Sequence, residues 1–331
     1  MSASPPSTPM PTGAGPQAPG ASWLSRVSKW PPAYILFALL LLALWVARPQ
    51  LMNLNVMGTF VRQVAPLGIV VLGQLLVMNA RSIDLSCGGV ILLVNFVLST
   101  AMIADDAPFT MIAAALCIGI TVGLLNGLLI AKRRVSALIV TLAVGIILTG
   151  IVQYLADGNT PGNVPQVLRD VYELRPLGVP LPVIFWATLS VVVAISLSRL
   201  VFGRWVSSIG ENPVAAHFSG VPVQRSVIVA HVLSGLLASI AGLVQTASIA
   251  VGSIRFGPEL VLNSIAATIL GGVVFGRGTG GVLGPFFGVL SFALLFVLMT
   301  TLGVREPGKL IAQGLIILLA AIVYGMRTDK R

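Results

Sequence analysis

The sequence predicts an all-α protein of the polytopic membrane class, a transmembrane helical bundle with about ten spans. Of its 331 residues, 56% are hydrophobic and only 9% are charged, whereas soluble proteins have about 25% charged residues. The mean hydropathy is +0.98. Apolar runs near the ~20 residues that a bilayer-spanning helix needs recur along the whole chain. These runs lack the period-two alternation of membrane β-strands, which excludes a β-barrel.

The apolar runs predict the spans in order along the chain. The first span is short, and Pro66 and Gly68 interrupt the second, so counts of nine or eleven also fit. A tail over residues 1–30 precedes the spans, and we expect it to be disordered because its first 22 residues are rich in Pro, Ser, Gly and Ala and have no charge. Residues 31–331 then form one transmembrane domain. The ten ranges are 33–47, 60–79, 88–104, 109–131, 136–154, 182–200, 226–250, 260–276, 280–302 and 309–326.

Lysine and arginine near the span ends predict the orientation, because cytoplasmic ends carry more of them. With ten spans and the N-terminus inside, 13 of the 20 bases fall on the cytoplasmic side and seven fall outside. Three acids fall inside and seven outside, so the net charge is +10 inside and zero outside. We therefore expect both termini and the loop 203–225 to be cytoplasmic. The positive charge reflects membrane orientation and does not indicate nucleic-acid binding.

The long cytoplasmic loop contains a short helix of its own. Asn212 can cap its N-terminus, Pro213 suits the first helical position, and Gly220 supplies the stop. The small side chains of Ala215 and Ala216 leave room for a partner protein to approach closely. Two interpretations remain open, a docking helix for a partner and an ordinary interfacial loop helix.

Six amide side chains fall in spans or at their edges, where each needs a hydrogen-bonding partner. Each amide either stabilises helix packing or lines a wet translocation path. As a set, uncharged hydrogen-bonding groups suit a polar, neutral solute better than an ion. The six are Gln74, Asn79, Asn95, Asn126, Gln245 and Asn263.

Three glycines are spaced four residues apart on one predicted span, at Gly119, Gly123 and Gly127. Small residues at this spacing allow two helices to approach backbone to backbone. We expect another helix to pack against this stripe.

The carboxylates all fall in loops or at span boundaries. Ion-driven transporters usually keep a titratable acid near the middle of the membrane. The sequence therefore favours transport driven by a separate motor, with a passive channel as the alternative.

Two glycine motifs resemble nucleotide-binding sequences but lack their context. Residues 276–281 fit GxGxxG, yet they join two predicted spans and have no acidic residue about 20 positions later. Residues 303–309 fit the start of a P-loop, but Leu310 takes the Ser/Thr position. We expect a tight turn at 276–281 and no ATP binding by the chain itself.

The cysteines and histidines are too scattered for a metal site. Cys117 falls within a span and Cys87 at the edge of one, and His217 and His231 stand apart from other ligand types. Packed cysteines and packed or solvated histidines are the expectation, with no metal, cofactor or catalytic group.

Six stretches occur in a specific order and spacing. They are SIDLS at 82–86, AKRRVSALIVTL at 131–142, RPLGVP at 175–180, GENPVAAHFSG at 210–220, SGLLASIAG at 234–242 and AATILGG at 266–272. Together they resemble the membrane-spanning permease of ribose-type ABC sugar importers, within the larger ribose and branched-chain amino acid permease family. The resemblance covers about residues 50–326.

The resemblance implies a bacterial inner-membrane machine of several subunits. Two permease subunits, identical or related, would surround a central path. Two cytoplasmic ABC ATPase subunits would hydrolyse ATP, and a periplasmic or lipoprotein binding protein would deliver a monosaccharide or related polyol. The resemblance also implies that the cytoplasmic loop contains the helix that couples to the ATPase. The residues that match this loop position by position are Gly210, Glu211, Asn212, Ala215, Ala216 and Gly220.

Two departures from the family pattern concern possible ligand contacts. Ser82, preceded by Arg81, stands where family members commonly have Gly, and Asn263 stands where many have an acid. We expect Asp84 to cap a broken helix with Ser82 and Ser86 rather than to contact substrate. The same machine carrying branched-chain amino acids or nucleosides is one alternative function. A stand-alone channel or secondary transporter is another.

Overall fold

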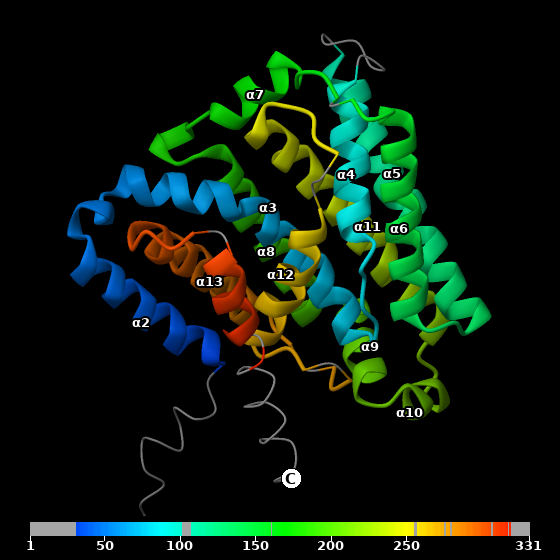
Figure 1. Ribbon diagram of the computed structural model, residues 1–331. Coiled ribbons are helices and arrows are strands. Elements are labelled where there is room, and N and C mark those ends of the chain that lie inside the picture. The colour runs from blue at the N-terminus through cyan, green and yellow to red at the C-terminus, as the bar shows by residue number, and fades with distance from the viewer. Residues whose placement is uncertain are drawn as a thin grey trace, which may run out of the picture. The chain divides into compact units, whose positions relative to one another are not determined.

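The computed structural model describes residues 31–100, 107–159, 161–254, 257–274, 276–278, 280–305, 307–316 and 318. In this part of the chain the named elements are all helices (Figure 1). The predicted tail at 1–30, both chain termini and most of the predicted span 309–326 lie outside the described residues.

The elements follow one another with short connections. In chain order they are α2 (Pro32–Ala47), η1 (Pro49–Met52), α3 (Leu54–Asn79), α4 (Cys87–Ser99), α5 (Pro108–Arg133), α6 (Ala137–Ala156), α7 (Gln166–Glu173), η2 (Pro176–Gly178), α8 (Leu181–Arg199), α9 (Val201–Glu211), α10 (Pro213–Phe218), α11 (Val223–Ile249), α12 (Pro258–Leu270) and α13 (Leu283–Thr301). Residues 307–316 are also helical.

Six of the described helices are long and apolar enough to cross a membrane, and each coincides with a predicted span: α3, α5, α6, α8, α11 and α13. Three shorter apolar helices, α2, α4 and α12, lie at three other predicted spans. The structure therefore supports an all-helical membrane protein with six long spans. A total of ten, and the cytoplasmic placement of the termini, stay predictions.

Helix α3 corrects one expectation, because it runs unbroken through Pro66. The predicted interruption at Pro66 and Gly68 is wrong. Gly68 instead allows close packing against α8, since a Cβ atom there would lie 2.2 Å from the Trp186 indole. Neighbouring helices enclose this half of α3, and such packing tolerates a proline inside a membrane helix.

Helix α11 is the central element of the bundle. The glycine stripe of α5 lies against it, so that the two backbones touch. A Cβ atom would come within 2.2 Å of the Gly235 carbonyl oxygen from Gly119, and within 2.4 Å of the His231 carbonyl oxygen from Gly123. Among the described residues, the helices with the most extensive contacts to α11 are α3, α4, α5, α7, α9 and α10.

The short helices α7 and α10 mark opposite ends of the long helices. In Figure 1, α9 and α10 lie at the bottom and α7 lies at the top. Arg134, just after α5, lines a pocket together with Pro213 and His217 of α10. The C-terminal end of α5 therefore lies beside α10.

Candidate functional site

Helix α10 is built by local cap chemistry, as the sequence predicts. Asn212 has an extended backbone, and its Oδ1 accepts hydrogen bonds from the Val214 N–H at 3.0 Å and the Ala215 N–H at 3.1 Å. Pro213 occupies the first helical position, where its missing N–H costs nothing. Gly220 has a φ of +81°, a left-handed conformation that favours glycine and ends the helix.

The outer face of α10 is apolar. Val214 and Phe218, four positions apart, are 63% and 85% exposed, and this spacing places them on the same side of the helix. Ala215 is exposed as well, but Ala216 packs into its own chain. The expected room for a partner therefore exists at Ala215 and not at Ala216. The sequence reasoning missed Val214 and Phe218, although their spacing was the signal.

Helix α9 connects α10 to the rest of the bundle through a glycine contact. Gly210 is buried, and a Cβ atom there would lie 2.1 Å from the Gly278 Cα and 2.3 Å from the Asn79 carbonyl oxygen. The Asn79 side chain donates a hydrogen bond to the Gly280 carbonyl oxygen at 3.0 Å. We call this contact between α9, the end of α3 and the α12–α13 turn the junction.

Gly276 and Gly278 have φ values of +82° and +61°, so the motif at 276–281 contains left-handed turn residues. Its place at the junction gives the motif a packing role.

Four of the six predicted amides form hydrogen bonds between elements, and three of them do so inside the bundle. Besides Asn79 at the junction, Asn95 of α4 donates to the Thr246 hydroxyl of α11 at 3.3 Å and accepts from the Ser253 N–H at 2.8 Å. Asn126 of α5 donates to the Ser86 hydroxyl at 2.8 Å. These contacts fit the structural interpretation of the amides.

The other three amides have different surroundings, so the six do not meet at one place. Gln74 is buried, and neither of its amide atoms has a hydrogen-bond partner among the described residues. Gln245 is half-buried on α11. Asn263 accepts a hydrogen bond from Gln313 and lines an open pocket.

Asp84 is a fully buried carboxylate, with 0% of its surface exposed. Its Oδ1 accepts from the Ser86 N–H at 2.9 Å and from the Ser86 hydroxyl at 2.6 Å. Its Oδ2 accepts from the Ser234 hydroxyl of α11 at 2.7 Å. Asp84 does lie in a loop, but helices enclose that loop, which sequence reasoning did not foresee.

Ser82 does not join Asp84 as a cap, in contrast to the expectation. Its hydroxyl lies 2.7 Å from Nε2 of His231, which is buried. His231 is therefore a packed histidine of α11, which is one of the two alternatives expected from the sequence. The contact of Asp84 with Ser234 and the contact of Ser82 with His231 both link this loop to α11.

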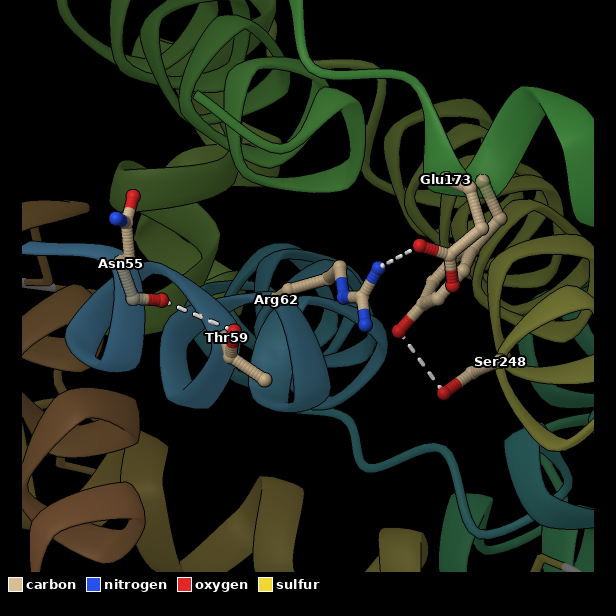
Figure 2. A network of polar contacts seen from close by, with 6 residues as sticks. Asn55, Thr59, Arg62, Glu173 and Ser248 are labelled. Atoms are coloured by element: carbon tan, nitrogen blue, oxygen red, sulfur yellow. Dashed lines mark hydrogen bonds and ion pairs between the residues drawn. The ribbon is translucent and has the colours of Figure 1, made fainter. Parts of the chain in front are cut away.

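A second polar network lies on the side of the bundle where α7 packs (Figure 2). Arg62 of α3 forms an ion pair with Glu173 of α7 at 2.7 Å, and its guanidinium lies 4.8 Å from the centre of the Tyr172 ring. The Tyr172 hydroxyl donates to the Ser248 hydroxyl of α11 at 3.0 Å. Arg62 and Tyr172 thus fasten α7 to both α3 and α11.

The chain is similar to permease proteins of bacterial transport systems. A family model described as branched-chain amino acid transport system / permease component matches residues 56–321. The ribose import permease protein of Escherichia coli (strain K12) is 30% identical over 87% of this chain and 92% of its own length. A probable ABC transporter permease protein of Sinorhizobium fredii is 32% identical over 88% of each chain. The L-arabinose transport system permease protein of Escherichia coli (strain K12) is 29% identical over 89% of this chain and 90% of its own.

Proposed function

The chain belongs to the family of permease components of branched-chain amino acid transport systems, and from this we infer that it is the sugar-translocating permease subunit of an ABC importer. It is a multi-pass protein of the bacterial inner membrane. The relatives named for ribose and L-arabinose match nearly their whole length, which supports a monosaccharide or a related polyol as the cargo.

The observation that carries this function is the construction of α10. It is a capped helix with an exposed apolar face, and the junction ties the preceding helix to α3 and to the α12–α13 turn. Exposed apolar residues on a short helix suit a groove on a partner protein. We assign α10 to the ATPase partner, with Val214 and Phe218 as the anchoring side chains.

In this mechanism the chain itself hydrolyses no ATP. ATP binding by two partner ATPase subunits would draw α10 inward as a rigid body. Gly210 would pass this movement to the end of α3 and to the α12–α13 turn. The backbones are in direct contact at Gly210, so α9 cannot move without displacing its neighbours. The cavity between this permease and a second permease subunit would then open to the binding protein outside.

Replacing Phe218 with alanine tests the assignment of α10. We expect Phe218→Ala to lower ATP-driven sugar uptake at least about tenfold, since losing a central apolar anchor costs about 2 kcal/mol of binding. Uptake of labelled ribose and arabinose into proteoliposomes containing the ATPase and the binding protein measures the effect. Phe109→Ala is the matched control, because Phe109 is 87% exposed at the start of α5, the end away from α10.

Two outcomes would contradict the proposal. Equal uptake by the Phe218→Ala and Phe109→Ala proteins would remove α10 from ATPase docking. Sugar uptake without any ATPase would favour a channel or a secondary transporter.

Branched-chain amino acids are the second cargo class to measure. The family description names branched-chain amino acid transport. ATP-dependent uptake of leucine, with no uptake of either pentose, would keep the machine and change its cargo.

A further inference from the structure

A cavity of about 490 Å³ lies at the end of the bundle away from α10. Helix α3 contributes Gln63 to this outer pocket and ends at Asn79 in the junction. At about 1.5 Å per residue, these two residues lie about 24 Å apart along the helix. Helices α12 and α13 give the same placement of the pocket. Glu259 at the start of α12 and Thr301 at the end of α13 both line it. Their other ends are joined by the turn that packs on α9.

The wall of the outer pocket is rich in uncharged hydrogen-bonding groups. Three amides line it, from Gln63, Asn263 and Gln313, together with Thr300 and Thr301, whose hydroxyls donate to carbonyl oxygens of their own helix and remain acceptors. Gln313 donates to Asn263, which fixes both amides at the wall. The amides can donate and accept, the two threonine hydroxyls can accept, and sugar hydroxyls need both functions.

The remaining wall adds apolar surface and two charges. Phe60 and Phe296 provide aromatic surface for the C–H groups of a sugar ring. The Glu259 carboxylate, in the first turn of α12, supplies two further acceptor oxygens. Lys309 also lines the pocket and already interacts within the chain. An apolar wall with a few placed polar groups, and a volume within about 300–1,000 Å³, is typical of small-molecule sites.

We propose that the outer pocket binds the transported monosaccharide as it enters the permease from the binding protein. Gln63, Asn263 and Gln313 bind sugar hydroxyls, and Phe60 and Phe296 contact the apolar side of the ring. The inference rests on the proposed function, because it takes the cargo class from there. The position of the pocket, opposite the docking helix, puts this step at the beginning of import.

Cysteine protection tests the proposal on the full-length chain in nanodiscs. Thr300→Cys places a thiol in the pocket wall, in a Cys117→Ser background because Cys117 is exposed while Cys87 is buried. A water-soluble maleimide then modifies the thiol with and without ribose or L-arabinose. At a sugar concentration of about ten times Kd, modification should slow about tenfold, because about a tenth of the sites stay empty. Leu174→Cys, exposed just after α7 and outside the pocket, is the control and should not slow.

The ratio of ribose uptake to arabinose uptake is a second readout, and a folding defect does not change this ratio. Gln313→Leu should lower the maximal uptake of ribose and of arabinose unequally, because each sugar presents its hydroxyls differently to the lost amide. A folding defect would lower both rates by the same factor. The measurement uses saturating loaded binding protein, so that its own affinity does not contribute.

Several results would overturn the proposal. Equal slowing at both cysteines, or none, would show that the pocket holds no sugar. Protection of the pocket cysteine by leucine alone would assign the pocket to amino acids. If the unmodified chain imports pentoses but shows no protection, the pocket assignment fails while the importer stands. If it imports neither pentose, the proposed function itself fails.

Discussion

Asp84 shows how one residue can link separate parts of the bundle. Its carboxylate holds the α3–α4 loop to α11 through Ser234, and Ser86 extends the link to Asn126 of α5. A buried carboxylate is tolerated when hydrogen bonds replace its lost hydration. Here two side-chain hydroxyls and one backbone N–H provide them.

Removing this carboxylate should destabilise the protein. Asp84→Ala leaves three buried donors without their acceptor, and we expect a loss of about 1–3 kcal/mol. Thermal unfolding in detergent measures the change. Asp170→Ala, on the exposed surface of α7, should cost less than about 0.5 kcal/mol. Equal shifts for the two variants would show that the Asp84 contacts contribute nothing.

At the scale of elements, the packing of α5 on α11 depends on the absence of side chains along the glycine stripe. At each of the three glycines the single atom nearest to a new Cβ is a backbone atom, which cannot rotate away as a side chain can. A single methyl group must therefore push the two helices apart.

Gly123→Ala is expected to destabilise the protein by about 1–3 kcal/mol through overpacking. A Cβ atom there would lie 2.4 Å from the His231 carbonyl oxygen and 2.8 Å from the Val232 Cα. Gly150→Ala of α6 is the matched control, since nothing lies within 4 Å of its Cβ position. That change should be neutral or stabilise by up to about 1 kcal/mol, because alanine favours helix. Thermal unfolding of both variants decides, and a neutral Gly123→Ala would contradict the backbone contact.

The sequence predicted elements well where the deciding contacts are local. The hydrogen bonds that cap α10 lie within three residues of Asn212, so this helix could be predicted from the local sequence. The continuity of α3 through Pro66 could not be predicted, because the helices that enclose this half of α3 come from distant parts of the sequence. The burial of Asp84 could not be predicted either, since Ser234 is 150 positions away. The six long spans followed from hydropathy alone.

At the scale of the whole molecule, the junction is a place where movement of α10 can enter the bundle through α9. Gly210 contacts the α12–α13 turn and the end of α3 at once. These helices continue to the outer pocket. The candidate coupling site and the candidate sugar site thus share three helices.

A methyl group at the junction should uncouple the motor from transport. In Gly210→Ala, the Cβ would lie 2.1 Å from the Gly278 Cα, so α9 must separate from the turn. We expect uptake to fall at least about tenfold, the effect of a coupling loss of about 1.4 kcal/mol, while ATP hydrolysis by the assembled complex continues. Parallel measurements of hydrolysis and uptake test this. Gly281→Ala, next to the same turn but with nothing within 4 Å, should keep both activities. Hydrolysis and uptake falling together in Gly210→Ala would point to failed assembly instead.

The unbroken course of α3 through Pro66 has a thermodynamic consequence. One continuous rod joins Gln63 in the outer pocket to Asn79 in the junction. Coupling between two binding sites is reciprocal, so each ligand changes the affinity of the other by the same factor. In the proposed mechanism, where α3 couples the two sites, a sugar in the outer pocket alters the affinity of the ATPase for α10 by the same factor with which the ATPase alters the affinity for sugar. The affinity of the ATPase for α10 would then change when sugar binds at the outer pocket, before any sugar molecule has crossed the membrane.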